Sequence, residues 1–180
     1  MLPRRVVTGV RAGRSVVLSD GSPPNAHAYA ALPGFMSSVL WATAATPAVP
    51  PEPGHEPAPP GVRVTPPPGE TRLLVVRFPP DAIFADPRFD PARAAEEQAA
   101  HLPGLAEAFE ADNPGMHTTD SLDYGVVIDG EISLELDDGE IVRLKQGDVV
   151  VQGGARHAWR NPSERPATMA FVLVGAARRS

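Results

Sequence analysis

Residues 115–161 read GMHTTDSLDYGVVIDGEISLELDDGEIVRLKQGDVVVQGGARHAWRN, and this stretch decides the fold of the chain. Its short runs of alternating apolar and polar residues are separated by turn pairs such as Asp129-Gly130. Asp-Gly between alternating runs is the strongest short signal of a β-hairpin. The sequence therefore predicts antiparallel strands over residues 124–128, 132–136, 141–144, 149–151, 157–160 and 169–174.

The N-terminal half predicts further strands, one long loop and one helix. Residues 4–8 and 14–18 are expected to form a hairpin, and strands are expected at 35–43 and 71–78. Residues 47–68 hold ten of the chain's 22 prolines. Because proline removes a backbone donor and fixes φ, we expect an exposed loop with polyproline character there. Asp90-Pro91 opens a peripheral helical segment over residues 90–111, since Asp suits the N-cap and Pro the first helical position.

Composition bounds the class of protein. The 180 residues suffice for one domain, and the chain contains no cysteine, which excludes disulfides and thiolate metal sites. A formal net charge of −6 argues against nucleic-acid and anionic-membrane partners, because both bind clustered Lys and Arg. No apolar run reaches the roughly 18–20 residues of a membrane span, and the N-terminus lacks a signal-like apolar core. We expect a soluble, cytoplasmic protein.

Two histidines and a carboxylate lie at opposite ends of the deciding stretch. His117 and Thr119 are two residues apart, so they point the same way in an extended segment, and Asp123 follows closely. His157 and Trp159 share a face of a later strand. If the hairpins bring these strands together, two imidazoles and one carboxylate suffice for a divalent first-row metal. By spacing alone, two histidines 40 residues apart can equally be unrelated.

Apolar side chains are expected to wall a ligand pocket beside these groups. Met169 and Phe171 alternate on the last expected strand, and Trp159 lies on the same face as His157. Trp41 is either a core residue or a pocket wall, since a large aromatic side chain suits both. We assign substrate binding to Trp159, Thr119, Met169, Phe171 and Trp41.

The stretch resembles the cupin family, which carries the motif G-x5-H-x-H-x3-4-E-x6-G and later the motif G-x5-P-x-G-x2-H-x3-N. The first motif's spacing is matched by His117, Thr119, Asp123 and Gly130, and the second is echoed by Gly147, Gly154, His157 and Asn161. Three replacements distinguish the residues of this chain from the residues of the family motifs. Threonine replaces the second histidine, aspartate replaces the glutamate, and Gln152 stands at the proline of the second motif.

This resemblance implies an all-β fold in a single domain over residues 1–180. We expect one antiparallel jelly-roll β-barrel at residues 114–175, an N-terminal strand extension at residues 1–80 and one peripheral α-helix. It further implies a homodimer and a small-molecule ligand. The metal ligands carried over are His117, Asp123 and His157, for a divalent transition metal such as Fe, Mn, Zn or Ni.

Two functions follow from the resemblance and its departures. The first is a metal-dependent enzyme acting on a small, partly apolar substrate, either as a non-redox lyase, isomerase or cyclase or as an Fe-dependent dioxygenase. Asp123 and His157 are its expected catalytic residues, and Asp123 acts as general base if the metal sits on the histidines. The alternative is a non-catalytic binding or sensing cupin, metal-free or with a structural metal. A DNA-binding regulator is rejected, because the sequence lacks a helix-turn-helix segment.

Overall fold

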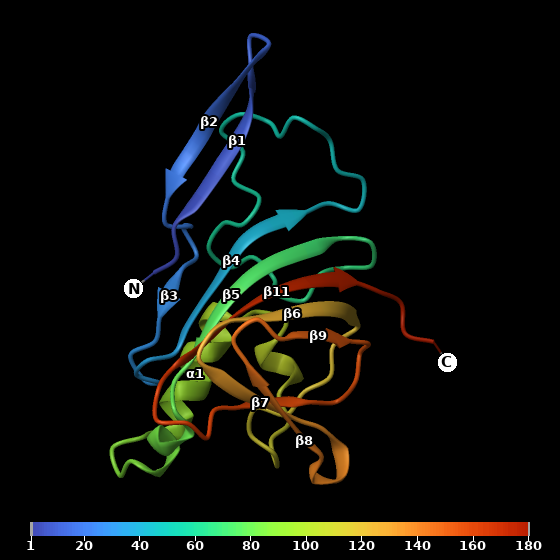
Figure 1. Ribbon diagram of the computed structural model, residues 1–180. Helices are drawn as coiled ribbons and strands as arrows, with labels where there is room; N and C mark the ends of the chain where they lie inside the picture. The colour runs from blue at the N-terminus through green and yellow to red at the C-terminus, as the bar shows by residue number, and fades with distance from the viewer. Residues whose placement is uncertain (1, 180) are drawn as a thin grey trace.

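A six-stranded antiparallel sheet forms the larger layer of the molecule (Figure 1). The computed structural model describes residues 2–179. The sheet has the order β3-β4-β5-β11-β6-β9. Its strands are β3 (His27–Ala28), β4 (Met36–Thr43), β5 (Thr71–Phe78), β11 (Ala167–Gly175), β6 (Ser121–Asp129) and β9 (Val149–Gln152). All ten strands predicted from the sequence are present, with ends that differ by at most three residues.

A three-stranded sheet of order β10-β7-β8 forms the smaller layer. Its strands are β7 (Glu131–Glu135), β8 (Ile141–Lys145) and β10 (Ala158–Arg160). The chain passes between the layers at Gly130, where φ is 80° and a Cβ would lie 2.8 Å from the carbonyl oxygen of Pro166. Ile132 and Leu134 of β7 share one buried cluster with Phe171 of β11. The two sheets therefore face each other, and the predicted all-β jelly-roll fold is confirmed.

Strict alternation along β6 gives the large sheet two different faces. Asp123 and Val127 are buried, whereas Tyr124 and Val126 are 43% and 37% exposed. We call the buried side the inner face, which looks toward the three-stranded sheet, and the other side the outer face. Strand β9 continues the pattern, with Gln152 on the inner face.

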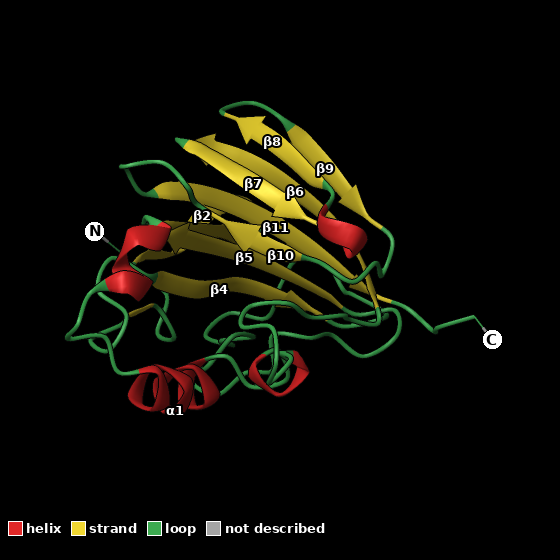
Figure 2. Ribbon diagram, turned by 90° about the horizontal axis from the view of Figure 1, so that it is seen from below, coloured by secondary structure: helices red, strands yellow, loops and turns green. Residues whose placement is uncertain are grey.

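The helix α1 (Pro91–His101) covers one end of the space below the inner face (Figure 2). As predicted, Asp90 is its N-cap, and the carboxylate accepts hydrogen bonds from the backbone N–H groups of Ala92 and Arg93. Three short 3-10 turns complete the chain: η1 (Asp81–Ala85), η2 (Ala106–Ala108) and η3 (Asp137–Gly139). None of the helices in residues 2–179 combines the length and apolar character needed to span a membrane.

The N-terminal hairpin stands apart from both sheets. Its strands β1 (Arg5–Arg11) and β2 (Arg14–Gly21) pair only with each other and project beyond the rest of the molecule (Figure 1). The Arg5 guanidinium lies over the ring of Trp41, 5.8 Å from its centroid, and donates to the carbonyl oxygen of Leu40. Arg5 thus anchors the base of the hairpin to β4, and its guanidinium also pairs with the Glu56 carboxylate of the proline-rich loop.

The proline-rich segment 47–68 contains no helix or strand, as expected, but only part of it is exposed. Val49 is 92% exposed, whereas Ala58 and Val64 are buried. The Asn25 amide donates to the carbonyl oxygen of Ala58 at 2.6 Å, and the Val64 N–H donates to that of Pro103 at 2.8 Å. The expectation of an exposed loop is therefore wrong for Ala58 and Val64, because these apolar residues between the prolines pack into the core.

Candidate metal and ligand site

His117 and His157 lie side by side, as the motif spacing predicted. They form an isolated antiparallel β-bridge in which each backbone N–H donates to the other's carbonyl oxygen, at 2.9 and 3.0 Å. Their imidazole rings have centroids 4.3 Å apart. The main chain itself therefore sets the distance between the two side chains.

Each imidazole is held in one tautomer by a backbone carbonyl. The Nδ1 atom of His117 lies 2.9 Å from the carbonyl oxygen of Gly115, and that of His157 lies 2.9 Å from the carbonyl oxygen of Ala155. Because a carbonyl oxygen only accepts, both Nδ1 atoms must carry the proton. The neutral ring then keeps its lone pair on Nε2, which is the form that binds a metal or accepts a proton.

Burial keeps both rings neutral at physiological pH. His117 and His157 are 7% and 3% exposed. Burial, together with the neighbouring His157, lowers the pKa of His117 to about 4. Burial also lowers the pKa of His157. A pair of neutral imidazoles is the state required of metal ligands.

Asp123 is a buried carboxyl group on the inner face of β6. It is 7% exposed, and its Oδ1 atom has no hydrogen-bond partner among the described residues. Burial raises the pKa of Asp123 to about 6, an effect that the Ser121 hydroxyl partly opposes. The group can therefore gain or lose a proton close to neutral pH, which suits a general acid or base.

These three side chains line one large cavity of about 970 Å³ between the two sheets and α1. Its walls are mostly apolar and aromatic. The Trp159 ring packs against His157 with centroids 5.9 Å apart and against Phe171 with centroids 5.5 Å apart. Ala94 and Ala95 of α1 and Leu102 at its C-cap close one side. Such a cavity suits a small ligand that is largely apolar.

The predicted substrate-binding residues divide into two groups. Thr119, Trp159 and Phe171 line the large cavity, whereas Met169 and Trp41 do not. Thr119 is buried, and its hydroxyl oxygen accepts a hydrogen bond from Ser121 at 3.0 Å.

The predictions that Met169 and Trp41 line the ligand cavity are wrong for different physical reasons. Met169 does face inward, but it is 0% exposed because it packs in the core over Gly125, where a Cβ would lie 3.3 Å from its methyl carbon. Trp41 follows a register shift in β4, where Val39 pairs with Leu74 but Trp41 pairs with Leu73. This bulge turns Trp41 to the outer face, away from the cavity.

His117 and His157 form a candidate pair of metal ligands. Among residues 2–179, no three His, Cys, Asp or Glu side chains lie close enough together to hold a metal ion. The structure brings His117 and His157 together and leaves Asp123 outside such a group. The two free Nε2 atoms have the chemistry of metal ligands, and further coordination positions stay open for water or substrate.

Gln152 is a cavity residue that sequence reasoning missed. It is 6% exposed, lines the cavity, and pairs with Asp123 in the register between β6 and β9. Its Nε2 atom has no hydrogen-bond partner among the described residues. The alternation of β9 places Gln152 on the inner face, whereas the motif comparison equates this position only with the proline of the second cupin motif.

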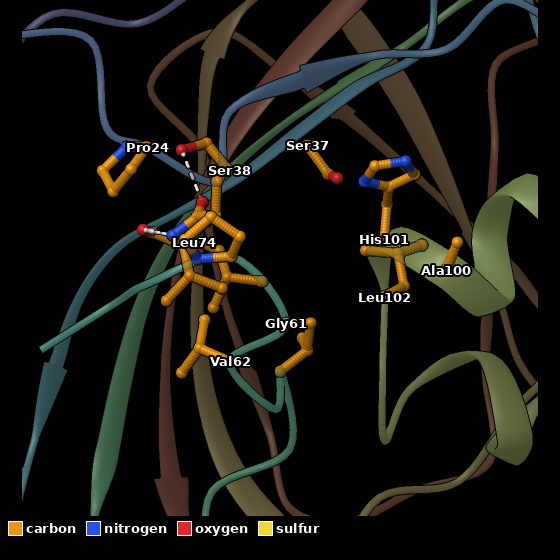
Figure 3. Close-up of a pocket in the computed structure, with 13 residues that line it drawn as sticks. Pro24, Ser37, Ser38, Gly61, Val62, Leu74, Ala100, His101 and Leu102 are labelled. Atoms are coloured by element: carbon orange, nitrogen blue, oxygen red, sulfur yellow. Dashed lines mark hydrogen bonds between the residues drawn. The ribbon is translucent and has the colours of Figure 1, made fainter.

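A second, smaller cavity of about 160 Å³ lies between the end of α1 and strands β4 and β5 (Figure 3). His101 borders one side, opposite Val62 and Leu74. The His101 ring stacks on that of His27 with centroids 3.4 Å apart, and His27 Nε2 lies 2.8 Å from a carboxylate oxygen of Glu97. These contacts fix α1 to the chain before β4, so the cluster is explained by packing.

Comparison with known proteins identifies relatives of the C-terminal part of the chain. Residues 110–174 match the family model described as Cupin domain. Over 62 residues the chain is 56% identical to Phomopsin biosynthesis cluster protein C' of Diaporthe leptostromiformis, which covers 34% of this chain and 33% of that protein. It is 47% identical over 62 residues to the cupin-domain-containing oxidoreductase virC of Hypocrea virens, covering 33% and 32%.

Among solved structures, a Cupin 2 conserved barrel domain protein from Salinispora arenicola CNS-205 is similar over 81% of this chain and 80% of that chain, with 17% identity and a TM-score of 0.42. The segment that matches the cupin family model, residues 110–174, contains both histidines of the site. The matched segment spans about a third of the length of the curated relatives.

Proposed function

We propose that this protein is a cupin enzyme that acts on a small, largely apolar molecule, with a divalent transition metal held by His117 and His157. The observation that carries the proposal is the histidine pair, buried at the cavity wall with both Nδ1–H groups donated to carbonyl oxygens. Such a metal supplies Lewis-acid polarisation of a carbonyl or enolate, or binds dioxygen if it is iron.

The protein's own residues supply binding and proton transfer. The Trp159 and Phe171 rings exclude water from the cavity and hold the apolar part of the substrate. Asp123 gives or takes a proton at its unpartnered Oδ1 atom, because its pKa of about 6 lies near the working pH. The relatives named as cupin-domain-containing oxidoreductases favour redox chemistry over a lyase or isomerase reaction.

The second candidate is a binding or sensing cupin without turnover. It is favoured by Thr119, whose hydroxyl is occupied by Ser121 where the family motif has a histidine, and by the position of Asp123 outside a three-ligand group. Metal analysis combined with His157→Ala separates the two. The enzyme requires loss of both metal and activity, whereas in a metal-free binding protein the substitution changes stability alone.

We also infer that two copies associate through the outer face of the large sheet. Leu122, Tyr124, Val126 and Ile128 of β6 are exposed there beside Val149 and Val151 of β9. The projecting hairpin is a second unpartnered element, and an isolated two-stranded hairpin is only marginally stable in water. A second copy of this chain can cover both features reciprocally across a two-fold axis.

A further inference from the structure

Asp123 and Gln152 form an unsatisfied polar pair within an otherwise apolar cavity. They are register partners on neighbouring strands β6 and β9 of the inner face. Asp123 is 7% exposed and Gln152 is 6% exposed, and both line the large cavity. Asp123 Oδ1 and Gln152 Nε2 are the buried side-chain atoms of residues 2–179 that lack any hydrogen-bond partner.

Leaving these two atoms unpaired is costly. A buried polar group without a partner destabilises a protein, because it loses its hydrogen bonds to water, so native structures contain few such groups. The two groups are chemically complementary, since an amide N–H donates and a carboxylate oxygen accepts. They lie on directly opposed residues and nevertheless do not bond to each other. One donor and one acceptor therefore remain available to a ligand in the cavity.

We propose that Gln152 and Asp123 bind the polar end of an apolar ligand that carries a carbonyl and a hydroxyl group a few bonds apart. The Gln152 Nε2–H donates to the carbonyl oxygen of the ligand, and the Asp123 Oδ1 atom accepts from its hydroxyl. Directly opposed side chains on neighbouring strands have Cβ atoms roughly 4.5–5.5 Å apart, which limits the separation of the two ligand groups. The ligand class is thus a hydroxyaryl or hydroxyalkyl ketone.

The remainder of the cavity matches the apolar part of such a ligand. Phe171 of β11 and Trp159 of β10 form an aromatic wall beside the pair. The volume of about 970 Å³ admits a molecule larger than one ring. The ligand hydroxyl then lies at Asp123, the residue to which we assign proton transfer. The catalytic meaning of this inference therefore rests on the proposed function.

Four one-ring probes test the pair by removing one ligand group at a time. They are 3-hydroxyacetophenone, acetophenone without the hydroxyl, 3-ethylphenol without the carbonyl, and ethylbenzene without either. Dissociation constants are measured at pH 7.5 by ligand-observed NMR on the wild-type chain. We expect the dissociation constant of 3-hydroxyacetophenone to be at least about tenfold lower than that of ethylbenzene, because each hydrogen bond lowers the dissociation constant severalfold.

Variants assign each hydrogen bond to its residue. Gln152→Leu should weaken only the two ketone probes, by about three- to tenfold, and Asp123→Leu should weaken only the two hydroxyl probes. Arg143→Ala, at an exposed position of β8 outside the cavity lining, should change none of the four. Gln152→Met serves as a second variant, so that a folding defect in one does not decide the outcome.

Two outcomes would overturn the inference. Equal weakening of all four probes would give Gln152 a packing role, and no change in any of them would mean that water satisfies the two atoms. His157→Ala separates this inference from the proposed metal. The preference for probes with a ketone and a hydroxyl group should persist in that variant even though its metal is lost. The proposed ligand binding by Gln152 and Asp123 can therefore be tested independently of the proposed metal site.

Discussion

The backbone N–H groups of His117 and His157 donate to each other's carbonyl oxygens, and this bridge sets their imidazole centroids 4.3 Å apart. Replacing either side chain leaves the bridge in place, since its hydrogen bonds belong to the main chain. The two imidazoles can therefore be removed singly to test their chemistry with limited damage to the fold.

Both histidines should be neutral Nδ1–H tautomers in the metal-free protein. The carbonyl oxygens of Gly115 and Ala155 require this tautomer, and burial lowers the pKa of His117 to about 4. Nitrogen-15 NMR of histidine-labelled protein after chelation should show two such rings at pH 7.5, and the His117 ring should stay neutral down to about pH 5. Resonances of Nε2–H tautomers for this pair would contradict the account, and the exposed His55 provides the reference.

Asp123→Asn should stabilise the protein more as the pH rises. Burial raises the pKa of Asp123 to about 6, so the folded state favours the protonated carboxyl. The contribution of this group to folding stability is therefore complete below the usual Asp pKa near 4 and is lost as the pH rises through 6. Relative to the wild type, the variant should gain up to about 3 kcal/mol between pH 4 and 7.5. Denaturant unfolding at both pH values measures this.

The control for that experiment is Asp129→Asn, at the exposed end of the same strand. It should show no comparable gain between the two pH values. A variant of Asp123 that loses stability at pH 7.5 more than at pH 4 would mean that the carboxylate is held ionised by a partner, contrary to its unpartnered Oδ1.

Asp90→Ala should weaken both the fold and ligand binding. The Asp90 carboxylate caps α1, and α1 closes one side of the cavity. Loss of an N-cap costs about 1 kcal/mol, which lowers Tm by about 2–4 °C in a chain of this size. Differential scanning calorimetry measures the shift, and Asp112→Ala at an exposed site should leave Tm within about 1 °C.

Charging the outer face should separate the two copies. Tyr124 and Val151 are register partners there, 43% and 60% exposed. The wild-type chain should sediment at twice its 19.0 kDa mass, and the double variant Tyr124→Lys/Val151→Lys at a single mass. Val49→Lys, at a 92% exposed site in the proline-rich loop, should remain dimeric. A monomeric wild type would overturn the proposed association.

The strands and the histidine pair could be predicted from the sequence because both follow from local patterns. Asp-Gly turns mark the hairpins, and β6 alternates without interruption from Ser121 to Ile128. His117 and His157 were placed together by motif spacing, and the β-bridge confirms that placement. The N-cap at Asp90 likewise depends on neighbouring residues alone.

The remaining features depend on contacts between distant segments, which no local pattern reveals. The bulge before Trp41 reverses the side that this residue faces, and it is visible only in the pairing of β4 with β5. Ala58 and Val64 of the proline-rich loop are buried in the core, where the Asn25 amide donates to the carbonyl oxygen of Ala58. Gln152 becomes meaningful only beside Asp123, its partner across the sheet.

The metal content of the protein tests the central claim most directly. The chain is purified in chelator-free buffer and analysed by inductively coupled plasma mass spectrometry. We predict about one equivalent of a divalent transition metal per chain, lost in His117→Ala and in His157→Ala and retained in Asp123→Asn. Less than about 0.2 equivalents in the wild type, with ligand binding unchanged by chelation, would contradict a metal held by the two histidines.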